Sequence, residues 1–296
     1  MTTETINATT SGTWTLGDLP VNRLGFGAMR LTANADGSPG DRDRAVAVLR
    51  RAVELGVNHI DTAAFYFSSL RSANELINTA LAPYPDGLVI ATKVWAGRDP
   101  SGDWRWASPA ELRGQVEENL RQLGRDHLDL VNLRVPRSGQ TGSIAEHFGA
   151  LAELRQAGLV RHLGVSNVSP AQLAEAREIA PVVCVQNACT IGAREQLEFV
   201  GACGEQGVAY VPFFAIAGRG REAGATGTEH DPVLTVARAH GVSPAQVRVA
   251  WTLGLGAHVL AIPGTGDPVH LEENVAAGAL RLTEEDMALL SSVPHV

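Results

Sequence analysis

The chain has 296 residues, of which 45% are hydrophobic and 19% charged, and its formal net charge is −8 at pH 7. This composition is that of an ordinary globular protein, and its acidic balance argues against nucleic acid and anionic membrane as partners. No apolar run approaches the roughly 20 residues that span a bilayer. Residues 1–12 have neither the basic start nor the apolar run of a signal peptide. We therefore expect a cytoplasmic protein with a flexible tail over residues 1–12 and one domain over residues 13–296.

The first predicted element is a hairpin over residues 14–21, because Gly17-Asp18 is a typical two-residue turn between short strands. Its apolar residues are expected to cover one end of the structure that follows. Short apolar runs then recur along the chain, and most lack strict alternation, which is typical of parallel strands buried on both faces. The predicted strands are residues 24–28, 57–60, 88–92, 128–133, 160–165, 182–186, 208–212 and 258–262.

Helical segments separate these strands. Residues 43–55 carry apolar positions at helical spacing and are followed by Gly56, a good C-cap. Three further helices are predicted to begin at Ser108, Ser169 and Ser243, because each serine is followed by Pro, Ala and then Glu or Gln. Eight strands alternating with helices indicate an α/β (β/α)8 barrel. A doubly wound sheet usually has a glycine-rich phosphate fingerprint after its first strand, and residues 25–30, Gly-Phe-Gly-Ala-Met-Arg, do not fit it.

Three long connections follow predicted strands, over residues 31–40, 95–107 and 213–231. Long loops in a compact barrel usually carry function. Because they follow strands, they are expected at the C-terminal face, where active sites of such barrels are built.

Lys93 is the single lysine of the chain, and the other 23 basic residues are arginine. It ends the third predicted strand, Asp61 ends the second, and Tyr66 follows five residues later. Strand ends converge in a barrel, so these side chains should meet. An adjacent ammonium lowers the phenol pKa from its usual value near 10, and such a tyrosine can protonate a carbonyl oxygen. Taken singly, Asp61 could be a cap, Tyr66 a lining residue and Lys93 an ordinary ion-pair partner.

Asp61-Thr62-Ala63 with Tyr66 and Lys93 resembles the aldo-keto reductase family, and the resemblance covers nearly the whole chain. Residues 21–25, Val-Asn-Arg-Leu-Gly, are similar to its pyridoxal (pyridoxine) reductase-like branch. The resemblance implies a (β/α)8 barrel that reduces carbonyls with NADPH through a catalytic Asp-Tyr-Lys-His tetrad.

The resemblance also implies where the cofactor lies. Residues 164–167 and 185–187 look like the segments that contact the nicotinamide amide, and residues 262–266 with 270–274 look like the adenosine-phosphate motif, where a helix N-terminus suits an anion. The implied cofactor-binding residues are Gly27, Met29, Asp61, Ser166, Asn167, Gln186, Phe213, Ile262, Gly264, Thr265, His270, Glu273 and Asn274.

Several positions depart from the family pattern. Arg134 stands in the usual place of the tetrad histidine, two residues before Pro136. Arginine is a donor only, so it can hold a carbonyl oxygen but cannot shuttle a proton. Phe213 replaces the tyrosine that stacks on nicotinamide. Gly264 and His270 replace the Lys and Arg that many members place on the 2′-phosphate, so binding of this phosphate is expected to be weaker. NADPH is still expected in preference to NADH, because the branch also tends to have His there.

The substrate pocket is expected to be lined by Phe67, which replaces a glycine, and by Trp95, Trp104 and Trp106, which suit an apolar or aromatic carbonyl. His59, two residues before Asp61, lacks the companions of a metal site, so no metal is expected.

The preferred hypothesis is an NADPH-dependent carbonyl reductase acting on a small molecule as a monomer or small homo-oligomer. Tyr66 would be the general acid, Lys93 would lower its pKa, Asp61 would anchor Lys93, and Arg134 would polarise the carbonyl. Two alternatives stay open. One is a subunit that binds NADPH in order to regulate or sense. The other is a redox-neutral lyase, dehydratase or cyclase, including Schiff-base chemistry on Lys93.

Overall fold

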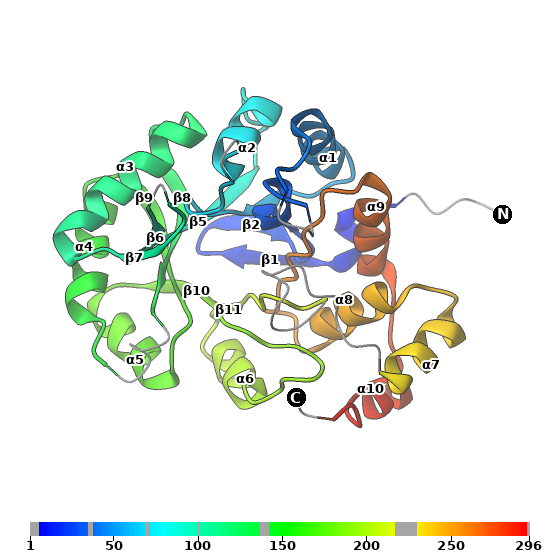
Figure 1. Cartoon of the computed structure of the whole chain (residues 1–296). Coiled ribbons are helices and arrows are strands. Elements are labelled where there is room, and N and C mark those ends of the chain that lie inside the picture. The colour runs from blue at the N-terminus through cyan, green and yellow to red at the C-terminus, as the bar shows by residue number, and fades with distance from the viewer. Residues whose placement is uncertain are drawn as a thin grey trace.

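The computed structural model describes residues 6–34, 38–68, 71–99, 101–136, 142–216 and 230–294. Their architecture is the predicted (β/α)8 barrel (Figure 1). Seven strands form one sheet in which every neighbouring pair is parallel. In sheet order they are β3 (Phe26–Gly27), β4 (His59–Asp61), β5 (Val89–Val94), β8 (Leu128–Arg134), β9 (Val160–Ser166), β10 (Val182–Gln186) and β11 (Ala209–Tyr210).

The eighth predicted strand, residues 258–262, closes the barrel through parallel bridges rather than as a continuous strand. Val259 pairs with Tyr210 on one side, and Ala261 pairs with Leu24 on the other. The N–H of Leu260 donates to the Tyr210 carbonyl at 2.9 Å, and the N–H of Gly25 donates to the Ala261 carbonyl at 2.8 Å. The sheet edges at β3 and β11 are therefore both paired, as barrel closure requires.

Helices surround the strands (Figure 1). They are α1 (Arg42–Glu54), α2 (Ala73–Leu81), α3 (Leu112–Leu123), α4 (Ala145–Gln156), α5 (Pro170–Ile179), α6 (Leu197–Glu205), α7 (Asp231–His240), α8 (Pro244–Gly254), α9 (Pro268–Ala276) and the C-terminal α10 (Glu284–Leu290). Short 3-10 turns lie over Ala8–Ser11, Ala28–Leu31, Pro109–Glu111 and Ala277–Ala279.

The helix starts predicted from Ser-Pro sequences are confirmed. Ser169 and Ser243 are N-caps of α5 and α8, and both form capping boxes with the glutamine three residues later. At Ser108 the chain first makes a 3-10 turn and then enters α3. Helix α1 ends as predicted, because Gly56 adopts a φ of 82°, which glycine reaches without strain.

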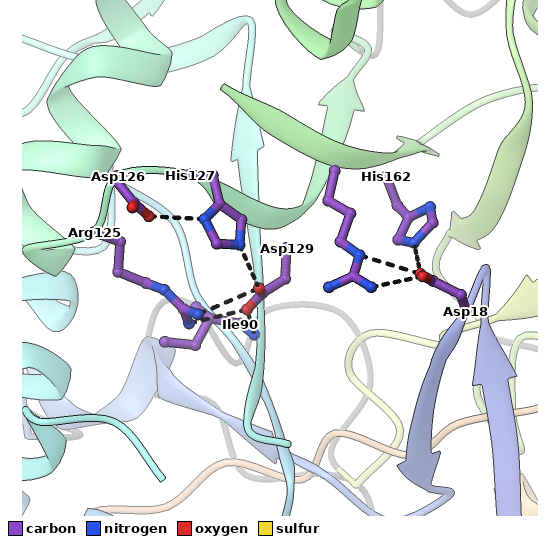
Figure 2. Close-up of polar contacts among 8 residues, drawn as sticks. Asp18, Ile90, Arg125, Asp126, His127, Asp129 and His162 are labelled. Carbon is purple, nitrogen blue, oxygen red and sulfur yellow. Dashed lines mark hydrogen bonds and ion pairs between the residues drawn. The ribbon is translucent and has the colours of Figure 1, made fainter. Parts of the chain in front are cut away.

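The N-terminal hairpin consists of β1 (Thr13–Leu16) and β2 (Leu19–Asn22). Leu16 and Val21 pack against residues that point into the barrel, Leu130 and Ala209 among them. The hairpin therefore plugs the N-terminal end of the barrel, as the sequence predicted. Its tip is held by Asp18, whose carboxylate accepts hydrogen bonds from Arg161 at 2.6 Å and from His162 at 2.5 Å (Figure 2).

A second polar group lies at the same end of the barrel (Figure 2). The buried Asp129 carboxylate accepts hydrogen bonds from the Ile90 N–H at 2.8 Å and from Arg125 at 3.0 Å. Asp129 thus ties the start of β5 to the start of β8 on the outer side of the barrel.

The segment expected to be a flexible tail is described from residue 6 onward. Ala8–Ser11 form a 3-10 turn, Ala8 is fully buried, and its N–H donates to the Leu55 carbonyl at 2.8 Å. This part of the segment packs on the end of α1, and residues 1–5 lie outside the described residues.

The long connections differ from one another. Residues 95–107 contain a hairpin of β6 (Ala96–Arg98) and β7 (Trp104–Trp106), which the sequence did not predict. Most of the connection that follows Phe213 lies outside the described residues. Among the helices that are described, none is long and apolar enough to cross a membrane.

Candidate functional site

Lys93 and Asp61 form a buried ion pair at the ends of β5 and β4. The Lys93 ammonium donates to both Asp61 carboxylate oxygens, at 2.7 and 2.8 Å, and to the Thr62 carbonyl at 2.9 Å. The two side chains are only 2% and 6% exposed. Burial lowers the pKa of Lys93, but Asp61 and Tyr66 together outweigh burial, so the pKa of Lys93 is raised. Lys93 is therefore held as a cation.

Tyr66 lies beside this pair. The Lys93 ammonium is 4.9 Å from the centre of the Tyr66 ring, and Phe65 packs edge-on against the same ring. Burial raises the pKa of Tyr66 above its usual value, while Lys93 and Arg134 lower it by less. Lys93 lowers the pKa of Tyr66, as predicted, but the pKa of Tyr66 is raised overall, whereas we expected it to be lowered. Tyr66 thus stays protonated at neutral pH, as a proton donor must be.

A buried polar network that the sequence analysis missed fixes the strand ends. The Asn119 side-chain oxygen, on α3, accepts a hydrogen bond from the Thr92 hydroxyl at 2.6 Å and one from the Asn74 amide at 3.0 Å. Asn74, on α2, accepts one from the Thr62 hydroxyl at 2.8 Å. All four side chains are fully buried. Since Thr62 and Thr92 adjoin Asp61 and Lys93, the network holds the ion pair in register; no local motif in the sequence announces it.

Arg134 ends β8, the strand that pairs with β5 beside Lys93. It donates to the Ser166 hydroxyl at 3.2 Å, and its guanidinium lies 5.1 Å from the centre of the Phe213 ring. Arg134, Tyr66, Lys93 and Asp61 all line one cavity at the C-terminal face. The structure therefore brings together the four residues predicted to be catalytic.

Six of the residues predicted to hold a cofactor, besides Asp61, line that same cavity: Gly27, Met29, Gln186, Phe213, Ile262 and Gly264. Gln186 donates to Asp61 at 2.7 Å, and its buried amide oxygen has no hydrogen-bond partner among the described residues. A Cβ at Gly264 would lie 2.3 Å from the Gly27 carbonyl, so the backbone here is closely apposed. A free buried acceptor and this side-chain-free wall suit a planar ligand that carries an amide.

Ser166 and Asn167 do not line this cavity but contact two residues that do, Arg134 and Gln186. Ser166 is fully buried and accepts the bond from Arg134. Asn167 has a φ of 62°, and its side-chain amide donates to the Val135 carbonyl at 2.8 Å. The positive φ is common for Asn and turns the chain out of β9.

Thr265 precedes α9, and His270, Glu273 and Asn274 lie within this helix. The sequence analysis missed Asp267, the N-cap of this helix. Its carboxylate accepts hydrogen bonds from the amides of Val269 at 2.8 Å and His270 at 3.3 Å, and it pairs with Arg44. Burial raises the pKa of Asp267, but these donors outweigh it and the net direction is downward. A negative charge thus already lies at the helix start predicted to hold a phosphate.

The four residues predicted to line the substrate pocket do not lie together around one cavity. Trp95 is buried and stacks on His147 at 3.9 Å. Phe67 and Trp106 line a second cavity between the hairpin and α3. Trp104 packs against Phe65 and Trp106 and is 43% exposed. The main cavity is instead lined by residues that the sequence analysis passed over: Arg30, Phe214, Ala215, Ile216 and Pro263. Arg30, Phe214 and Pro263 directly follow Met29, Phe213 and Ile262 in the sequence, and this adjacency could have identified them as lining residues.

No group of three or more potential metal ligands occurs within the part of the chain that the structure describes. His59 is buried inside the barrel, and burial lowers its pKa to about 4.

Residues 23–294 match the family described as the aldo/keto reductase family. A pyridoxine 4-dehydrogenase of Escherichia coli K12 is 46% identical over 289 residues, which cover 96% of this chain and 98% of the relative. The structure is similar to that of a glycerol dehydrogenase from Gluconobacter oxydans, with a TM-score of 0.79, 25% identity and coverage of 96% and 95% of the two chains. It also resembles an aldo/keto reductase from Klebsiella pneumoniae in complex with NADP and acetate, with a TM-score of 0.76, 24% identity and 93% of each chain covered.

Proposed function

The chain belongs to the aldo/keto reductase family and is an oxidoreductase; from this we propose that it interconverts an aldehyde or ketone and the alcohol with NADPH, using Tyr66 as the proton donor. The observation that carries the proposal is the packing of Tyr66 against a buried Lys93–Asp61 pair at the cavity that also contains Gln186.

The residues around the main cavity suit a nicotinamide cofactor, which supplies hydride when bound. Gln186 would hold the amide group through its free buried oxygen, with Ser166 and Asn167 beside it. Phe213 offers a ring to stack on, and Gly27 and Gly264 line the cavity without a side chain. The solved relative from Klebsiella pneumoniae is a complex with NADP, which favours this class of cofactor.

Proton transfer would fall to Tyr66, because its hydroxyl is protonated at neutral pH. Lys93 would stabilise the negative charge that develops on the phenol oxygen, and Asp61 would keep Lys93 charged and oriented. Arg134 would donate a hydrogen bond to the carbonyl oxygen. It cannot replace Tyr66, since a guanidinium does not give up its proton in this pH range.

The 46% identical relative is a pyridoxine 4-dehydrogenase. We take pyridoxine and the aldehyde formed from it at position 4 as the first substrate pair to test. The basic Arg134 and the aromatic Phe213 and Phe214 at the cavity suit a planar, polar ring.

Schiff-base chemistry on Lys93 fits the structure less well. It requires a neutral amine as nucleophile, whereas Lys93 is held as a cation by three hydrogen bonds. A protein that binds NADPH only to regulate would retain the cofactor residues but would not need the buried Lys93–Asp61 pair.

The direct test is a titration of the purified protein with NADPH and then NADH, followed by a panel of aldehydes that includes the 4-aldehyde of pyridoxine. Binding of NADPH with oxidation of the cofactor by an aldehyde is the expected result. Binding without turnover across the panel would favour the regulatory reading, and binding of neither dinucleotide would overturn the cofactor assignment.

A further inference from the structure

A second cavity lies beside the tetrad, distinct from the one that contains Gln186 and Gly264. It has a volume of about 570 Å³, within the usual range of small-molecule sites. Its walls are Ala64, Phe65 and Phe67, the hairpin β6–β7 and one side of α3. Lys93 lies in the wall that the two cavities share.

One side of this cavity is basic. Arg98 and Arg105, from the two strands of the hairpin, both line it and are both exposed. Neither forms an ion pair with a carboxylate of the described residues. The Arg98 guanidinium instead lies 4.5 Å from the centre of the Trp104 ring, so an aromatic contact and not an acid sets its position.

The opposite wall, α3 and the turn before it, contains two acids that are already bound elsewhere. The Glu111 carboxylate accepts a hydrogen bond from the Ser108 N–H at 2.7 Å, and burial of these groups is slight. The Glu118 carboxylate pairs with Arg121 at 2.7 Å. The charge of Arg105 also helps to lower the pKa of Glu111, after the hydrogen bonds from Ser108, so these two side chains are near each other. Arg98 is therefore the guanidinium of this cavity that has no acid beside it among the described residues.

The same cavity has an aromatic lining. Phe65, Phe67 and Trp106 all line it, and Trp106 is 44% exposed. A large exposed tryptophan in a cavity with an arginine that has no acidic partner, Arg98, is the combination that recognises a flat ring with an anionic substituent.

We propose that this second cavity binds a small planar aromatic anion, of the aryl carboxylate or aryl phosphate class, with Arg98 and Arg105 on the anionic group and Trp106 against the ring. The site goes beyond the proposed reductase activity, because the ligand lies on the other side of the Tyr66 loop from the cofactor residues.

Calorimetric titration of the full-length protein with phenyl phosphate and benzoate tests the proposal. Benzyl alcohol, which lacks the charge, and inorganic phosphate, which lacks the ring, are the comparison ligands. We expect at least one of the aromatic anions to bind, and to bind at least about tenfold more tightly than either comparison ligand.

Variants distinguish the two cavities. Arg98→Gln and Arg105→Gln should each weaken binding of the aromatic anion about tenfold, and Trp106→Leu should weaken it while leaving any inorganic phosphate binding unchanged. Two controls should leave binding unchanged: Arg113→Gln, which changes an exposed arginine of α3, and Arg134→Gln, which changes an arginine of the main cavity.

Loss of binding in Arg134→Gln with none in the hairpin variants would place the anion in the main cavity and overturn the proposal, as would the absence of binding at millimolar ligand. Since Arg98, Arg105 and Trp106 are exposed, these variants should fold normally, and the outcome does not depend on reductase turnover.

Discussion

The Lys93 ammonium donates to both carboxylate oxygens of Asp61, and both side chains are almost completely buried. Such a pair is stable only as a pair, because removing one partner leaves the other as an uncompensated charge in the barrel.

Asp61→Asn should therefore damage both stability and activity. Loss of the carboxylate leaves Lys93 unpaired, which we expect to lower the free energy of unfolding by about 3–5 kcal/mol and turnover by about 100-fold or more. Urea unfolding and steady-state kinetics measure the two effects. Asp103→Asn, on the exposed part of the hairpin loop, is the control and should change neither; an Asp61→Asn protein with normal stability would contradict the ion-pair account.

Asn119→Ala tests the polar network behind the tetrad. Thr92 and Asn74 would lose their shared acceptor while remaining buried, at a cost of about 3 kcal/mol in the free energy of unfolding. Glu117→Ala, exposed on the same helix, should cost much less. If the two variants unfold at the same urea concentration, the network does not stabilise the strand ends.

Cofactor preference should respond to Asp267. Its carboxylate lies at the start of α9, where the 2′-phosphate of NADPH is expected, and like charges repel. Asp267→Asn retains an N-cap and should raise the preference for NADPH over NADH roughly fivefold at low ionic strength. Arg44→Gln removes the partner of Asp267 and should shift the preference in the opposite direction. Fluorescence titrations with the two dinucleotides measure the ratio, and equal ratios in all three proteins would place the phosphate elsewhere.

His59 makes stability depend on pH. Burial lowers its pKa from 6.5 to about 4, so the unfolded chain takes up this proton first as the pH falls. Neutral His59 therefore contributes about 3 kcal/mol to the free energy of unfolding. This contribution is fully present above about pH 6.5 and is lost as the pH falls towards 4. Urea unfolding at several pH values should show this decline in the wild type and a shallower one in His59→Gln. Parallel curves for the two proteins would exclude His59 as the source.

The fold was predictable because its signals are local. Each strand is a short apolar run, and each of the Ser108, Ser169 and Ser243 helix starts has its cap, its proline and its capping residue together in the sequence. The meeting of Asp61, Lys93 and Arg134 at one cavity was predictable for a related reason: the C-terminal ends of barrel strands converge on a common opening.

Other features depend on contacts between distant segments. Trp95 adopts a φ of 77° and turns onto His147, fifty-two residues away in the chain, so its role as core rather than substrate lining is invisible locally. The pairing of Asp267 with Arg44 and the Thr62–Asn74–Asn119–Thr92 network likewise join separate elements. The net pKa of Tyr66 depends on how deeply its ring is covered, which no spacing of residues reveals.

The most direct test of the central claim is hydride transfer by Tyr66→Phe, measured in a single turnover with NADPH and the aldehyde identified by the panel, alongside NADPH binding to the same variant. We predict that NADPH binds as tightly as to the wild type, since Tyr66 contributes the proton and not the cofactor grip, while the rate of transfer falls by about 100-fold or more. A variant that reduces the aldehyde at the wild-type rate would contradict the assignment of Tyr66 as the proton donor.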